Sequence, residues 1–169
     1  KGMVIFMGME IERKFLVKKL PDNLEQYEYR QIEQAYLNTN PVVRIRRSDE
    51  DYYLTYKGNG LMAREEYNLP LDAESYQHLL EKADGHPITK KRYLIPLSSR
   101  EINEECQRLL NGASLTIELD VFEGALAPLV LAEIEFPSRE AARVYRMDTR
   151  FSRDVTENPD YHNSNMIYL

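Results

Sequence analysis

The chain has 169 residues, of which 43% are hydrophobic and 30% charged, and its net charge is −6 at pH 7. This length supports one hydrophobic core, so we expect a single domain over residues 1–169. The negative charge argues against binding to a nucleic-acid duplex, because phosphate-backbone contacts need a basic surface. No apolar run approaches the roughly 18 residues of a membrane span. The single cysteine, Cys106, cannot form an internal disulfide, which is typical of a cytoplasmic protein without a membrane partner.

Alternation of apolar and polar residues, together with β-branched and aromatic side chains, predicts eight strands. In chain order they cover residues 9–17, 28–38, 42–48, 51–58, 63–69, 88–96, 115–123 and 131–136. Turn-forming residues between several of them predict antiparallel hairpins in a mostly up-and-down order. Eight strands are enough to close a barrel whose interior holds side chains and one small ligand.

Helices are expected beside these strands, in the connections and after the last strand. They are a short helix after Pro21 and helices over about 72–83, 99–111 and 138–147. Asp72 and Ser138 stand where an N-cap is needed, and Ser98 with Glu101 has the spacing of a capping box. Cys106 falls within the third of these helices, where packing is its expected role.

Charged residues recur at every second position in five strands, so they share one face of each strand. They are Glu10, Glu12 and Lys14; Arg44 and Arg46; Lys90 and Arg92; Glu118 and Asp120; and Glu133 and Glu135. For any one strand, an ordinary half-buried sheet with its charged face in water explains the pattern. Like charges nevertheless gather in pairs, which destabilise a fold unless a counter-charge is supplied. A metal-bound polyphosphate carries both signs, so we predict an inverted barrel with a charged interior and helices over its apolar outer face.

The segment Glu10-Ile11-Glu12-Arg13-Lys14 resembles the Glu-x-Glu-x-Lys signature that opens proteins of the CYTH family, the bacterial triphosphate tunnel metalloenzymes. Other segments are similar to successive family motifs in the family's order: 34–37, 43–46, 54–58, 64–67, 90–93, 117–122 and 132–136. The resemblance covers nearly the whole chain. It implies a β-dominated α+β fold, in which an eight-stranded antiparallel barrel forms the triphosphate tunnel under peripheral helices. It also implies a divalent cation, Mg²⁺ or Mn²⁺, and cleavage of a phosphoanhydride bond.

The resemblance also implies roles for individual residues. Those expected to bind substrate phosphates are Lys14, Arg44, Arg46, Lys57, Lys90 and Arg92. Those expected to bind metal are Glu10, Glu12, Glu133 and Glu135, with Glu66, Glu118 and Asp120 near a second metal position. Lys14 and Tyr36 are implied as the catalytic pair that acts as a base or positions the attacking water. The alternatives are an ion pair or a phosphate contact for Lys14, and simple packing for Tyr36.

Two features depart from the family pattern. His162 stands where relatives usually have a lysine, which predicts a weaker or pH-dependent contribution at the tunnel mouth. The helix over 99–111 stands where many relatives have a tight hairpin, and its expected roles are to cap the barrel or to form a homodimer.

The substrate is the least determined feature, since one tunnel serves inorganic triphosphatases, thiamine triphosphatases, class IV adenylate cyclases and RNA-end triphosphatases. The chain has no tryptophan, which removes the best stacking partner for an organic base and favours inorganic tripolyphosphate. A polyphosphate or nucleotide sensor without turnover is the competing function, although acid clusters would add nothing to a simple anion binder. A structural domain with solvated charged faces is the third alternative.

Overall fold

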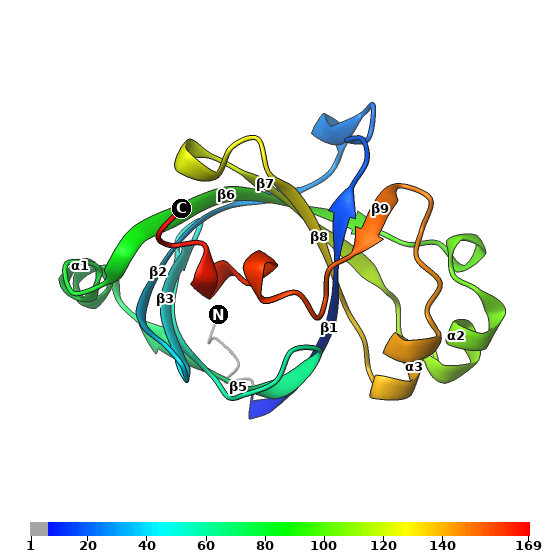
Figure 1. Ribbon diagram of the computed structural model, residues 1–169, viewed down its shortest axis with the longest axis horizontal. Coiled ribbons are helices and arrows are strands. Elements are labelled where there is room, and N and C mark those ends of the chain that lie inside the picture. The colour runs from blue at the N-terminus through cyan, green and yellow to red at the C-terminus, as the bar shows by residue number, and fades with distance from the viewer. Residues whose placement is uncertain (1–6) are drawn as a thin grey trace.

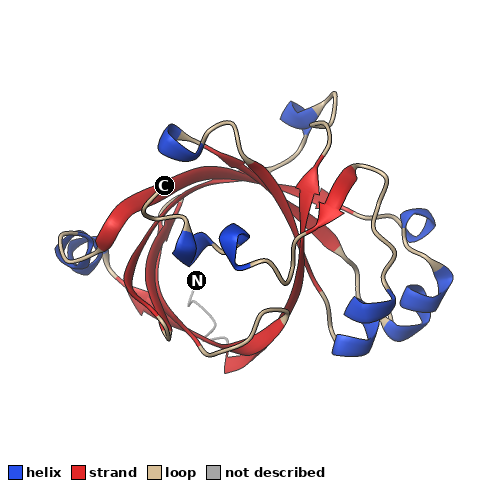
Figure 2. Ribbon diagram, in the orientation of Figure 1, coloured by secondary structure: helices blue, strands red, loops and turns tan. Residues whose placement is uncertain are grey.

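The computed structural model describes residues 7–169, and its strands form a closed β-barrel (Figures 1 and 2). The strands are β1 (Met7–Val17), β2 (Tyr29–Thr39), β3 (Val42–Ser48), β4 (Asp51–Lys57), β5 (Ala63–Leu71), β6 (Asp84–Pro96), β7 (Thr116–Phe122), β8 (Val130–Glu135) and β9 (Phe151–Asp154). Their order is β5-β4-β3-β2-β6-β7-β8-β1-β9, and β5 also pairs with β1. This pairing closes eight antiparallel strands into a barrel and leaves β9 alongside the end of β1. The predicted barrel is confirmed.

The order of the strands is up-and-down within two runs, β2 to β5 and β6 to β8, where neighbours in sequence are neighbours in the sheet. β1 instead pairs with β5 and β8, and β2 pairs with β6. The two runs are therefore joined in two ways, by the pairing of β2 with β6 and through β1. Hairpin signals do not predict either connection.

The three α-helices lie outside the barrel (Figure 2) and cover parts of its apolar outer face, whereas the last two 3₁₀ turns lie across one end of the barrel. The helices are α1 (Ala73–Leu80), α2 (Glu104–Leu109) and α3 (Arg139–Val144), with 3₁₀ turns at Leu24–Gln26, Ser99–Glu101, Gly124–Leu126, Pro159–Tyr161 and Asn163–Asn165. Tyr76 of α1 packs against Ala35 and Ile45, which point outward from β2 and β3. Cys106 of α2 is buried in a cluster that includes Phe15 of β1, as expected for packing. In the described residues, no helix is long and apolar enough to span a membrane.

The helices begin where their predicted caps stand. Asp72 Oδ1 accepts the Ser75 N–H at 2.7 Å, and Ser138 Oγ accepts the Ala141 N–H at 3.1 Å. They end earlier than predicted, and α3 stops before Tyr145, whose backbone is extended. The N-caps were predicted correctly because they are local signals, whereas the C-terminal ends of the helices depend on tertiary contacts.

The continuous helix predicted over residues 99–111 is wrong, because a 3₁₀ turn and α2 are separated by an extended break. Asn103 lies in the break and uses its side chain elsewhere. Its Nδ2 donates to the Val144 carbonyl at 3.0 Å, and its Oδ1 accepts the Arg146 N–H at 2.9 Å. Asn103 thus satisfies backbone groups at the end of α3. A continuous helix through residue 103 would remove these bonds.

Residues 155–167, which we call the closing segment, lie across one end of the barrel (Figure 1). Met166 and Ile167 are buried in a cluster with Ile88 and Phe122, from the inner faces of β6 and β7. The Ile167 carbonyl also accepts the His86 N–H at 3.0 Å. Apolar side chains therefore anchor the segment across this end, although the strand pattern gave no indication of it.

Candidate active site

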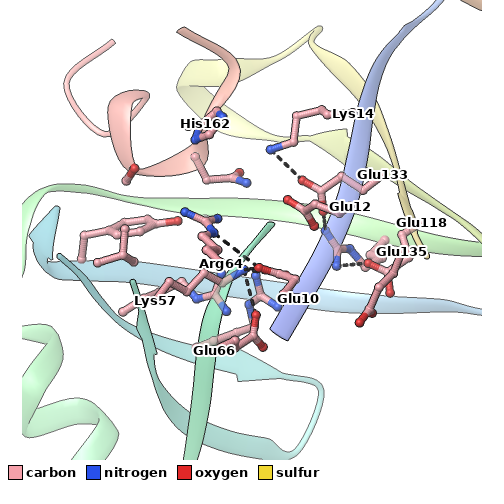
Figure 3. Close-up of a pocket in the computed structure, with 17 residues that line it drawn as sticks. Glu10, Glu12, Lys14, Lys57, Arg64, Glu66, Glu118, Glu133, Glu135 and His162 are labelled. Carbon is pink, nitrogen blue, oxygen red and sulfur yellow. Dashed lines mark hydrogen bonds and ion pairs between the residues drawn. The ribbon is translucent and has the colours of Figure 1, made fainter. Parts of the chain in front are cut away.

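The barrel encloses a cavity of about 160 Å³ to which all eight barrel strands and the closing segment contribute side chains (Figure 3). The predicted residues that line it are Glu10, Glu12, Lys14, Tyr36, Arg44, Arg46, Lys57, Glu66, Arg92, Glu118, Glu133 and Glu135. Strand alternation therefore predicted the inner face of each strand. A further cavity at the rim away from the closing segment shares four of these carboxylates and adds Gly8, Arg30 and Asn68.

Two predicted site residues, Lys90 and Asp120, lie behind this lining. Both are fully buried, and Lys90 Nζ donates to Asp120 Oδ2 at 2.6 Å. Asp120 also accepts from Nε and Nη2 of Arg92, each at 2.7 Å. Burial lowers the pKa of Lys90 to about 8. Here the two residues support Arg92 from behind and do not border the cavity.

Five lining residues were not among the predicted site residues: His162, which was expected only at the tunnel mouth, and Val42, Arg64, Asn163 and Ser164. Arg64 lies two positions before Glu66 on β5, so alternation contained the signal for it. Its Nε donates to Glu10 Oε2 at 3.4 Å. Asn163 and Ser164 belong to the closing segment, where no strand periodicity could have identified them.

Arg44 and Arg46 are buried side by side on the inner face of β3, and neither has an acidic partner in the described part of the chain. Arg46 Nε and Nη2 donate to Gln34 Oε1 at 3.1 and 2.7 Å, and its Nη1 donates to Tyr53 Oη at 3.3 Å. Arg44 Nη2 donates to Thr55 Oγ1 at 3.2 Å, while its Nε has no hydrogen-bond partner. A buried charge without a counter-charge is costly. The two guanidinium groups are therefore chemically suited to an anion, and their forked donors suit phosphate.

Lys14 is held at both sides of its ammonium group. Its Nζ lies 2.9 Å from Glu133 Oε1 and donates to the Tyr161 carbonyl at 3.2 Å. Burial alone would lower the pKa of Lys14, but Glu133 and Glu12 raise it above its usual value. Lys14 is therefore a positively charged donor at neutral pH.

Tyr36 is buried, and its hydroxyl oxygen accepts a hydrogen bond from Gln34 Nε2 at 3.0 Å. The same Gln34 side chain accepts from Arg46, so it links the predicted tyrosine to the arginine pair. In the described residues, no hydrogen bond joins Tyr36 to Lys14, although both line the cavity.

Lys57 and His162 show how the positive charge is distributed. Lys57 Nζ lies 2.6 Å from Glu10 Oε2 and 3.0 Å from Glu66 Oε2, so this base is already paired (Figure 3). His162 lines the cavity, and burial followed by the charge of Lys14 lowers its pKa below the usual value. Its ring is thus neutral at pH 7. This agrees with the expectation that histidine contributes less positive charge than the lysine it replaces.

Glu12 and Glu135 face each other across β1 and β8, and within residues 7–169 neither side chain has a basic partner at ion-pair distance. Burial, followed by Glu10 and Glu133, raises the pKa of Glu12 to about 8. Burial, followed by Glu10 and Glu118, raises that of Glu135 to about 7. Like charges directly opposite each other destabilise a sheet. A cation bound between the two carboxylates would remove this repulsion.

The acidic side chains fit a divalent cation in kind, since hard oxygen ligands suit Mg²⁺ and Mn²⁺. Among residues 7–169, no three His, Cys, Asp or Glu side chains come close enough together to form a metal site on their own. Mg²⁺ usually binds through one or two carboxylates, water and substrate phosphates. Glu12 and Glu135 match that requirement.

Glutamine at two neighbouring carboxylates is expected to change stability in opposite directions. Burial alone would raise the pKa of Glu133, but Lys14 and Arg92 hold it well below its usual value. Glu133→Gln should therefore destabilise the metal-free protein, by roughly 3 to 5 kcal/mol for a broken buried ion pair. Glu12→Gln should raise the melting temperature by a few degrees, since about 1 kcal/mol corresponds to roughly 2 to 4 °C at this size. Thermal unfolding in the presence of a chelator measures the stability of both variants. A lower melting temperature for Glu12→Gln would contradict the expected repulsion between Glu12 and the neighbouring carboxylates.

Known proteins resemble this chain over nearly its whole length. The CYTH domain family matches residues 8–147. The inorganic triphosphatase of Nitrosomonas europaea is 33% identical over 157 residues, which cover 91% of this chain and 93% of the relative. That of Acetivibrio thermocellus is 31% identical over 168 residues, with 95% and 94% covered. A crystal structure of an inorganic triphosphatase matches with a TM-score of 0.65 at 31% identity, over 95% of each chain. The chain with the Glu10 to Lys14 signature therefore belongs to the CYTH domain family.

Proposed function

We propose that the protein hydrolyses a phosphoanhydride bond of a small triphosphate, with inorganic tripolyphosphate as its preferred substrate and Mg²⁺ or Mn²⁺ as its cofactor. The observation that carries the proposal is the pair of buried arginines, Arg44 and Arg46, that border a narrow cavity without an acidic partner. A polyphosphate chain supplies the missing negative charge. The similarity to inorganic triphosphatases of two bacteria supports the same class of reaction.

The cavity suits an extended polyanion because its bases come from several strands. Arg44 and Arg46 lie on β3, Lys57 on β4, Arg64 on β5 and Arg92 on β6. A triphosphate can reach several of these groups, whereas pyrophosphate reaches fewer. Each contact left unmade by Arg44 or Arg46, which have no acidic partner in the described residues, costs about 1 to 3 kcal/mol, which corresponds to roughly tenfold discrimination or more. Lys57, Arg64 and Arg92 are already paired with carboxylates and contribute less to this discrimination.

Hydrolysis requires a water in line with the terminal phosphorus and stabilisation of charge on the leaving pyrophosphate. Lys14 is charged, so it serves as a donor to that water or to a phosphate oxygen and not as a base. The Tyr36 hydroxyl accepts from Gln34 and keeps its own proton for donation into the cavity. A Mg²⁺ or Mn²⁺ ion held by Glu12 and Glu135 would neutralise phosphate charge and lower the pKa of a bound water. A loose transition state demands little further help from a base.

The test is phosphate release from tripolyphosphate, ATP, thiamine triphosphate and pyrophosphate at equal free Mg²⁺ or Mn²⁺. We expect kcat/KM for tripolyphosphate to exceed that for ATP by about tenfold or more, because adenosine adds bulk without stacking on a tryptophan. Pyrophosphate should be the poorest substrate. Preference for ATP or thiamine triphosphate, or cyclic AMP as the product, would contradict the specificity. Binding of every triphosphate without turnover would favour the sensor.

A further inference from the structure

We propose that Asp154 and Thr156 are positioning residues that set the place of Lys14 from outside the cavity. The inference rests on the function proposed above, in which the Lys14 ammonium acts on the triphosphate or on the attacking water. Neither Asp154 nor Thr156 borders the cavity. Asp154 is the last residue of β9 and Thr156 is the second residue of the closing segment, so both belong to the turn between these two elements, beside the Lys14 backbone.

The backbone of Lys14 is held on both of its polar groups by this turn. Thr156 is buried, and its Oγ1 accepts the Lys14 N–H at 3.0 Å. The N–H of Val155 donates to the Lys14 carbonyl at 2.8 Å. The Thr156 hydroxyl donates its one proton to Asp154 Oδ1 at 2.5 Å. That donation leaves an oxygen lone pair for the Lys14 N–H.

Asp154 is itself fixed, with its two oxygens serving different partners. Oδ2 accepts from Nε and Nη2 of Arg13 at 3.1 and 2.5 Å, while Oδ1 also accepts the Thr156 N–H at 2.9 Å. Arg13 is anchored in turn, because its Nη1 donates to the carbonyls of Ala142 and Tyr145 at 2.9 and 2.7 Å. The position of the turn is therefore fixed by α3 through Arg13.

The closing segment also contacts the ammonium group of Lys14. The chain continues from Thr156 to Tyr161, whose carbonyl accepts from Lys14 Nζ at 3.2 Å. One short stretch thus holds both the backbone of Lys14 and an acceptor for its ammonium, opposite Glu133. A lysine side chain is long and flexible, and misplacing a catalytic group by about 1 Å can cost on the order of 10²-fold in rate.

The test compares Thr156→Val with Thr156→Ser. Valine keeps the branched shape without a hydroxyl, whereas serine keeps the hydroxyl. We expect Thr156→Val to lower kcat for tripolyphosphate by about tenfold or more with KM within about threefold, because a misplaced Lys14 acts on the reaction step. Thr156→Ser should restore kcat to within about threefold of the unmodified protein. Asp154→Asn should lower kcat as well, because its amide cannot accept from both Arg13 and Thr156.

Glu157→Gln is the matched control, since it makes the same carboxylate-to-amide change at the exposed residue after Thr156. Melting temperature, and binding of a non-hydrolysable imidotriphosphate, give the folded and binding-competent fraction of each variant. Unchanged kcat in Thr156→Val and Asp154→Asn would overturn the inference, as would equal losses in Thr156→Ser and Thr156→Val. If Thr156→Val does not fold, the comparison of Asp154→Asn with Glu157→Gln decides. An unmodified protein that hydrolyses no triphosphate would instead overturn the proposed function.

Discussion

Replacing Arg44 by glutamine is expected to lower kcat/KM for tripolyphosphate by about a hundredfold to a thousandfold, the range found when a key transition-state donor is removed. Arg44 is buried on the cavity wall, its Nε has no hydrogen-bond partner, and a substrate phosphate would supply one. Glutamine carries neither the charge nor the forked donors of arginine. Steady-state phosphate release at fixed free Mg²⁺ measures the loss. Arg46→Gln should act in the same direction.

Arg47→Gln provides the control, because Arg47 lies on the same strand but is exposed on the outer face. Its kcat/KM should stay within about twofold of the unmodified protein, as for most surface substitutions. The melting temperature of Arg44→Gln without substrate should be unchanged or higher, since a buried charge lacking a counter-charge is removed. Activity of Arg44→Gln within threefold of the unmodified protein would exclude the arginine pair as the substrate site.

Replacing Glu12 or Glu135 by glutamine is expected to lower kcat by about a hundredfold or more and to raise the Mg²⁺ concentration needed for half-maximal activity. These two carboxylates lack basic partners within the described residues, and we propose that they bind the cation. Removing all divalent cations with a chelator should abolish turnover by the unmodified protein. Titration of activity with Mg²⁺ and with Mn²⁺ gives both quantities.

Glu65→Gln is the control for the acidic positions, because Glu65 is exposed on β5 and neighbours Glu66 in sequence. It should leave the Mg²⁺ dependence unchanged. If Glu12→Gln and Glu135→Gln both retain normal turnover with the same Mg²⁺ dependence, the proposed metal role is wrong. An activity loss that saturating Mg²⁺ does not reverse, together with lower thermal stability, would indicate a folding defect.

Strand alternation was sufficient to predict which side chains enter the barrel, because the direction of a side chain on a strand is a local property. Glu10, Glu12 and Lys14 lie on one face of β1, and all three line the cavity. Alternation does not predict how deeply a side chain is buried or whether it borders the cavity. Lys90 has the same parity as Arg92, yet it is fully buried against Asp120 and does not border the cavity.

Other features depended on contacts between residues far apart in the chain. Asn103 interrupts the predicted helix because it bonds to the backbone of Val144 and Arg146, which no local pattern contains. The closing segment has no strand or helix periodicity, and its position depends on burial of Met166 and Ile167 among inner residues of the barrel. A single sequence holds no signal that joins such segments.

The closing segment limits how a polymer can be handled. An enzyme that degrades a long chain processively lets the chain advance through a channel with an entrance and a separate exit. Here the closing segment lies across one end, anchored by Met166 and Ile167, and its Asn163 and Ser164 line the cavity. A long polyphosphate advancing toward this end would meet these side chains, and under the proposed function we expect the products of each cleavage to leave by the route through which the substrate entered. The geometry therefore favours distributive action on short chains.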